Sequence, residues 1–156
     1  MTKQSLYETL ARELQSLFRD EHEMVCNMAN FSSVAFHSLP DVNWAGFYRL
    51  CGGQLLLGPF QGKPACIRIP VGRGVCGTAA AKRRSVLVAD VREFEGHIAC
   101  DPDSRSELVV PLIDSEGRLR GVFDLDSTTI GRFDATDQQG IESLVKVFLK
   151  QTILAT

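Results

Sequence analysis

The chain has 156 residues, a length typical of one domain, and 44% of them are hydrophobic, which is enough for a real core. Its formal net charge of −2 offers no basic footprint for nucleic acid, and no apolar run approaches the ~18 residues that a membrane span needs. Residues 1–18 are amphipathic and partly acidic, unlike a secretory signal. We therefore expect a single domain over residues 1–156 in the cytoplasm, where its five cysteines would be reduced at rest.

The N-terminal third predicts two helices. Apolar residues recur at helical spacing in the first: Leu6, Leu10, Leu14, Leu17 and Phe18. The second runs from Met24 through Val34 and should end before Leu39, because the proline that follows disfavours helical backbone there. Cys26 is expected on the apolar side of this second helix, as a small core residue.

After residue 40 the pattern changes to strands. Residues 42–50 and 54–60 predict a hairpin across a glycine turn, and residues 107–113 and 119–127 predict a second hairpin. Residues 66–71 and 85–91 read as short strands, and a glycine-led loop and helix lies between them at 72–84. Residues 134–154 close the chain as an amphipathic helix. The long connection over 92–105 is typical of a functional loop, and its apolar Ile98 favours an ordered lid.

This order predicts an α+β domain. We expect one central antiparallel sheet, with the N- and C-terminal helices packed on one face and the long loops covering the other.

Three cysteines stand in contexts that suit chemistry. Cys76 follows glycines at a helix start, where the helix dipole favours a thiolate, so local electrostatics alone favour Cys76 as a nucleophile. Cys100 lies in the long loop, where reactive residues are usually presented, but the neighbouring Asp101 should raise its pKa. Cys66 is the third of these cysteines. The residues alone do not show which of the three thiols is the nucleophile.

A zinc site is the competing interpretation of these cysteines. Cys66, Cys76, Cys100 and His97 supply the ligand types of a Cys3His site. No CxxC pair is present, however, and Cys66 and Cys76 are ten residues apart. We therefore expect no metal.

Acidic residues gather on the predicted second hairpin. Asp124 and Asp126 are two apart on one strand and so point to the same face. If the hairpin closes across residues 114–118, Glu107 lies level with one of them. The group suits either a solvated sheet face or a pocket for an ammonium group, with a carboxyl kept protonated to act as an acid.

Two aromatic residues share a face of the first strand. Trp44 and Tyr48 are four residues apart, which predicts the same side of the sheet. They fit core packing, or a pocket wall whose polar tips are directed at a ligand.

Five segments together resemble the free methionine-(R)-sulfoxide reductases, a family built on a GAF domain. The segments are NWAGFYRL, GPFQGKPACIRIPVGRGVCGTAA, FEGHIACD, SELVVPLI and GVFDLDS. The likeness runs from about Asn43 to the final helix and keeps the order and spacing of the three cysteines. It implies a GAF-like fold and reduction of the free amino acid sulfoxide to methionine, with no metal or organic cofactor.

The resemblance also implies roles for individual residues. Cys100 would be the nucleophile, which overrules the local preference for Cys76, and Cys66 would resolve its sulfenic acid as a disulfide that thioredoxin recycles. Cys76 would be an alternative partner. The implied substrate-binding residues are Trp44, Tyr48, Glu107, Asp124 and Asp126. On chemical grounds, a carboxyl with a raised pKa or backbone N–H groups of residues 97–101 would stabilise the charge that develops on the sulfoxide oxygen, and we favour Asp126 or Glu107 for this role.

Further expectations rest on the family alone. A homodimer is expected by analogy with GAF domains that pair through their terminal helices. The family usually has proline where this chain has Glu95, which puts the rigidity of the loop in question. The alternative function is a non-catalytic GAF module that binds a small ligand or senses redox state. It predicts an attached output domain, for which we expect no room in this chain.

Overall fold

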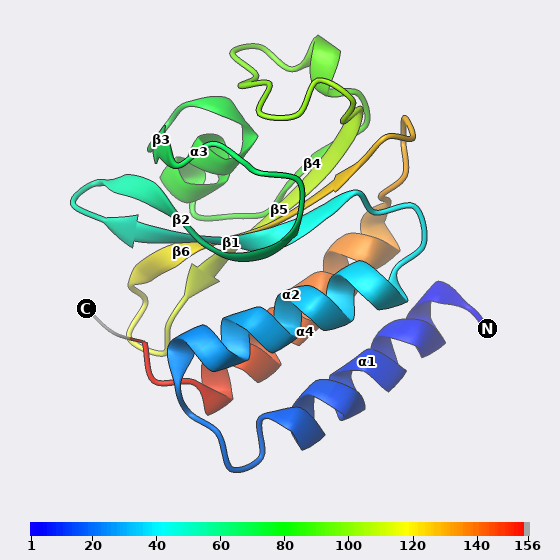
Figure 1. Cartoon of the computed structure of the whole chain (residues 1–156), viewed down its shortest axis with the longest axis vertical. Coiled ribbons are helices and arrows are strands. Elements are labelled where there is room, and N and C mark those ends of the chain that lie inside the picture. The colour runs from blue at the N-terminus through cyan, green and yellow to red at the C-terminus, as the bar shows by residue number, and fades with distance from the viewer. Residues whose placement is uncertain (155–156) are drawn as a thin grey trace.

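The computed structural model describes residues 1–154, which form an α+β fold (Figure 1). Its helices within this range are α1 (Lys3–Leu17), α2 (Met24–Ser38), α3 (Gly74–Lys82) and α4 (Ala135–Gln151), with a 3-10 turn η1 (Val91–Glu93). Its strands are β1 (Trp44–Cys51), β2 (Gln54–Gly62), β3 (Arg68–Pro70), β4 (Val86–Val88), β5 (Ser106–Ile113) and β6 (Leu119–Ser127). The predicted order of helices and strands is confirmed. The two short strands are shorter than predicted, and the last helix ends three residues earlier.

The strands form one antiparallel sheet in the order β3-β2-β1-β6-β5-β4. Helices α2 and α4 pack on one face, and α1 lies outside them against α4 (Figure 1). Helix α3 and the long loops cover the opposite face (Figure 1). The predicted arrangement of terminal helices on one face and loops on the other is therefore confirmed.

Strand alternation divides the side chains between two cores. Phe47 and Phe123 point to the helical face, where Phe31 packs edge-on against both, with ring centroids 5.3 and 4.7 Å away. Intervening residues point to the loop face, which has its own apolar cluster around Val109 and Val122. The candidate site residues of β1, β5 and β6 belong to this second face.

Cys26 is exposed, so its predicted place in the core is wrong. The buried face of α2 contains Met28 and Phe31. Cys26 lies two residues before Met28, about 200° around the helix from it. Within residues 1–154, no helix is both long and apolar enough to span a membrane.

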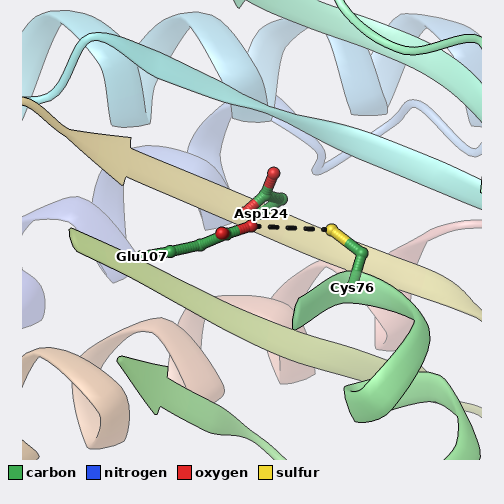
Figure 2. Close-up of side chains that lie close together, drawn as sticks. All are labelled: Cys76, Glu107 and Asp124. Atoms are coloured by element: carbon green, nitrogen blue, oxygen red, sulfur yellow. Dashed lines mark hydrogen bonds between the residues drawn. The ribbon is translucent and has the colours of Figure 1, made fainter. Parts of the chain in front are cut away.

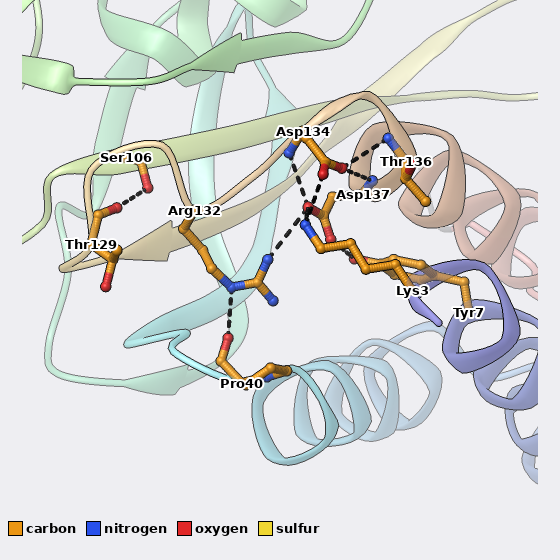
Figure 3. A network of polar contacts seen from close by, with 9 residues as sticks. All are labelled: Lys3, Tyr7, Pro40, Ser106, Thr129, Arg132, Asp134, Thr136 and Asp137. Carbon is orange, nitrogen blue, oxygen red and sulfur yellow. Dashed lines mark hydrogen bonds and ion pairs between the residues drawn. The ribbon is translucent and has the colours of Figure 1, made fainter. Parts of the chain in front are cut away.

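A buried carboxylate fastens α1 to the start of α4 (Figure 3). Asp137 is 1% exposed and accepts hydrogen bonds from Tyr7 Oη at 2.8 Å and Lys3 Nζ at 2.7 Å. It also accepts from Asp134 N at 2.9 Å, which completes a capping box at the helix start. Arg132 Nη1 lies 3.4 Å from the same carboxylate. One buried charge is thus compensated by several donors from different segments.

Replacing Asp137 by asparagine should destabilise the fold by roughly 3 kcal/mol, because an amide group would face donors that now share a carboxylate. The measurement is urea unfolding followed by circular dichroism. Asp134→Asn is the matched control, since it is exposed and asparagine caps a helix about as well as aspartate. Equal stability of the Asp137→Asn variant and the wild type would refute the structural role of this network.

Candidate active site

The loop face of the sheet holds a cavity of about 50 Å³. Strand residues Trp44, Tyr48, Glu107, Asp124 and Asp126 form its floor, and the start of α3 and the loop around Cys100 complete it. Of the eight residues expected at the site, seven line this cavity, including Cys76. The eighth, Cys66, is bonded to Cys100 and follows the lining residue Ala65.

The three acids meet through the pairing of β5 and β6. Glu107 lies directly opposite Asp126, and Asp124 lies opposite Val109. Glu107 and Asp124 are only 6% and 5% exposed. The prediction that Glu107 lies level with one of the two aspartates is therefore confirmed. The burial of Glu107 and Asp124 excludes the alternative of a solvated sheet face.

Burial changes the proton affinity of these acids. Burial, followed by the charge of Asp126, raises the pKa of Glu107 to about 8. Burial also raises the pKa of Asp124 well above its usual range, with Glu107 as the next cause. The pKa of Asp126 is likewise raised by burial and then by Asp124. Glu107 therefore holds a proton near neutral pH, and a cationic ligand in the cavity would stabilise the ionised form of these acids.

Cys76 lies against this acid group (Figure 2). It is the third residue of α3, is 5% exposed, and its Sγ is 3.8 Å from Glu107 Oε1. Burial, followed by the charges of Asp124 and Glu107, raises the pKa of the thiol well above its ordinary value. The expectation of a stabilised thiolate at Cys76 is therefore wrong, because burial beside acids outweighs the helix dipole.

Cys66 and Cys100 are joined by a disulfide, with Cα atoms 5.5 Å apart across a separation of 34 residues. The expectation of reduced thiols does not hold for this pair in the structure, because the two loops bring the sulfurs into bonding range. The bond also uses two of the four residues considered for a Cys3His site. Cys51 and Cys76 are free, as is the exposed Cys26.

The aromatic pair holds the loop that carries Cys66. Trp44 Nε1 donates to the Lys63 carbonyl at 3.1 Å, and Tyr48 Oη donates to the Cys66 carbonyl at 2.9 Å. The two rings stack with centroids 5.9 Å apart. Both line the cavity, but the expectation that their polar tips are directed at a ligand is wrong here, because backbone carbonyls of the loop accept those bonds.

The Cys100 loop is anchored on both sides. Asp101 accepts from Asn43 Nδ2 at 3.3 Å and from Asp103 N at 3.0 Å. These donors offset the negative charge beside Cys100. Ile98 packs over Gly74, whose φ of +65° would strain any other residue, and a Cβ at this position would lie 3.1 Å from the Ile98 side chain.

Sequence reasoning missed two basic residues of the site. His97, considered from the sequence as a candidate zinc ligand, lines the cavity, with Nε2 3.9 Å from Glu107 Oε2. Burial lowers its pKa, which favours the neutral ring. Arg73, which precedes α3, also lines the cavity. Their places depend on how the loops fold over the sheet, and no periodic signal in the sequence marks them.

Comparison with known proteins identifies close relatives. A family model described as a GAF domain matches residues 11–147. A free methionine-R-sulfoxide reductase of Escherichia coli (strain K12) is 48% identical over 156 residues, which cover 100% of this chain and 93% of that protein. The enzyme of the same name from Saccharomyces cerevisiae is 40% identical, over 98% of this chain and 89% of its own length.

Solved structures of similar proteins have the same fold as this chain. The X-ray structure of a free methionine-R-sulfoxide reductase from Neisseria meningitidis in complex with its substrate has a TM-score of 0.92 and 43% identity, covering 97% of this chain and 90% of that one. A structure described as a putative GAF sensor protein from Burkholderia vietnamiensis has a TM-score of 0.95 and 51% identity, covering 97% and 96%.

Proposed function

Because this chain belongs to the free methionine-R-sulfoxide reductases, a family with the GAF fold, it reduces free methionine-R-sulfoxide to methionine, and we propose that the reduction proceeds through a sulfenic acid on Cys100 and a disulfide with Cys66. The observation that carries the mechanism is the Cys66–Cys100 disulfide beside a cavity floored by three acids. The alternative of a non-catalytic GAF module has no comparable support, since that disulfide and its acid pocket match a reductase.

Substrate binding divides between the acids and the aromatic residues. The α-ammonium group of the free amino acid would lie against Asp124 and Asp126, whose negative charge is otherwise unfavourable at this depth. A peptide-bound residue lacks this ammonium group, which accounts for the preference for the free amino acid. The rings of Trp44 and Tyr48 would contact the methyl end of the substrate.

Reduction is the first chemical step. The Cys100 thiolate attacks the sulfoxide sulfur, the oxygen passes to Cys100 as sulfenic acid, and methionine leaves. The sulfoxide is reduced by two electrons, Cys100 is oxidised by two, and one proton is consumed. Glu107 would supply that proton, because its pKa of about 8 keeps it largely protonated at neutral pH. The side chain of His97 beside it is 18% exposed.

Recycling follows in two thiol steps. The Cys66 thiol condenses with the sulfenic acid, forming the disulfide and releasing water. A thioredoxin dithiol then exchanges with that disulfide, which returns both cysteines to thiols and oxidises thioredoxin. These steps suit a cytoplasmic protein, in which such reductants keep thiols reduced. Pairing of two chains as a homodimer stays a prediction.

The test of this division of labour is the Cys66→Ser variant. It should still form one methionine per chain, because Cys100 is intact, but turnover supported by thioredoxin should fall at least about tenfold. Rapid-quench and steady-state assays with a thioredoxin system measure the two quantities. Cys51→Ser is the control and should recycle normally.

Cys76 is the one thiol that could replace Cys66. It is 5% exposed beside Glu107, so we expect little replacement. Combining Cys66→Ser with Cys76→Ser removes it altogether. Undiminished thioredoxin-dependent turnover in this double variant would contradict the proposed disulfide.

A further inference from the structure

A second cluster of ligand atoms lies in the pocket, apart from the disulfide. Cys76 Sγ, one carboxylate oxygen of Glu107 and one of Asp124 lie within 4.8 Å of one another. They project from α3, β5 and β6 toward a common point (Figure 2). Each of the three residues is at most 6% exposed. A soft sulfur donor and two hard oxygen donors are thus gathered in one buried place.

The cluster is only partly satisfied within the protein, although Asp124 shares hydrogen bonds with Glu107 and Cys76. Asp124 Oδ1 is buried and has no hydrogen-bond partner. Among the ion pairs formed by residues 1–154, none involves Asp124, and the contact of Cys76 with Glu107 is long at 3.8 Å. A buried carboxylate oxygen without a partner is costly and points to a ligand. Because its neighbours are a thiol and a second carboxyl, that ligand should be a cation.

We propose that Cys76, Glu107 and Asp124 form a binding site for a divalent cation of the zinc class. Zinc binds thiolates at ~2.3 Å and carboxylates at ~2.1 Å in tetrahedral geometry, so its ligand atoms lie roughly 3.5 Å apart. The 3.8 Å between Cys76 Sγ and Glu107 Oε1 is close to that spacing. Magnesium and calcium take oxygen ligands only, so the sulfur selects against them. Binding releases to solvent the thiol proton of Cys76 and the proton that Glu107 holds at neutral pH.

This site differs from the zinc site considered from the sequence, with which it shares only Cys76. It uses neither Cys66 nor Cys100, so all three ligands stay available when the disulfide is formed. A bound ion would occupy the acids that face the substrate and would compete with its ammonium group. That consequence rests on the proposed function, whereas the metal site itself does not.

Cobalt is the probe of choice, because a cobalt–thiolate bond absorbs in the near ultraviolet. The experiment uses the full chain with Cys26→Ser and Cys51→Ser, oxidised so that Cys66 and Cys100 are bonded and Cys76 is the one free thiol. Co²⁺ is titrated without thiol reductant and followed by absorption and calorimetry. We expect one ion per chain, a charge-transfer band, and loss of that band when Zn²⁺ is added.

Two further substitutions in this background locate the site. Cys76→Ser should abolish the band and weaken binding at least tenfold. Asp124→Asn should weaken binding at least tenfold while far-ultraviolet circular dichroism shows the fold retained, and Glu116→Gln, in an exposed turn, should bind as the parent does. The proposal is overturned if the parent binds no stoichiometric Co²⁺, or if Cys76→Ser keeps both band and affinity. No turnover is measured, so failure here is distinct from failure of the proposed mechanism.

Discussion

Replacing Cys100 by serine should abolish reduction of free methionine-R-sulfoxide, with a fall of at least about a thousandfold in rate. The loss should extend to a single turnover, because a serine hydroxyl is a far weaker nucleophile toward sulfur and forms no sulfenic acid. The measurement is methionine formed per chain after mixing reduced enzyme with one equivalent of the sulfoxide. Cys26→Ser is the matched control, since Cys26 is exposed on α2 and should be silent.

One methionine per chain from the Cys100→Ser enzyme would refute the assignment of the nucleophile. Cys76 would then be the first residue to reconsider, because it lines the same cavity. Its buried position beside Glu107, which raises the pKa of the thiol, argues against that outcome.

Replacing Glu107 by glutamine should lower kcat by about a hundredfold or more, because a positioned proton donor contributes roughly 10² to 10⁴ in rate. Glutamine keeps the shape of the side chain and cannot give up a proton. Stopped-flow or quenched assays on reduced enzyme measure the chemical step directly. Glu116→Gln makes the same change in an exposed turn and should leave the rate unaltered.

The neighbouring acid separates proton transfer from binding. Asp126→Asn should mainly raise KM for the sulfoxide, because Asp126 is proposed to hold the ammonium group. If the Glu107→Gln enzyme reacts at the wild-type rate and the Asp126→Asn enzyme is slowed instead, Asp126 is the proton donor. Two unaffected variants would mean that substrate binds elsewhere.

Local periodicity in the sequence predicted much of the architecture. The leucine stripe of residues 6–18 marks α1, and the two-residue spacing of Asp124 and Asp126 places both on the loop face of β6. Because β5 and β6 are joined by a short turn, the sequence also predicted that Glu107 lies level with one of these aspartates, and the strand register shows that this is Asp126. These features depend on neighbours within a few residues or across one hairpin.

The errors at the site came from contacts between distant segments, whereas the error on Cys26 was local. The raised pKa of the Cys76 thiol depends first on burial and then on acids more than thirty residues away on two other strands, which local reasoning about a helix start does not include. The polar tips of Trp44 and Tyr48 are taken by a loop 18 or 19 residues further along the chain. Cys26 was misplaced because its helix has apolar residues on more than one side, such as the exposed Val25.

The most direct test of the mechanism is to locate the oxygen atom that leaves the sulfoxide in a single turnover. Reduced enzyme carrying Cys66→Ser and Cys76→Ser is mixed with one equivalent of free methionine-R-sulfoxide, and sulfenic acid is trapped with dimedone and located by peptide mass spectrometry. The mechanism predicts one methionine and one trapped sulfenic acid per chain, on Cys100. Methionine formed with Cys100 unmodified, or a sulfenic acid on another cysteine, would contradict it.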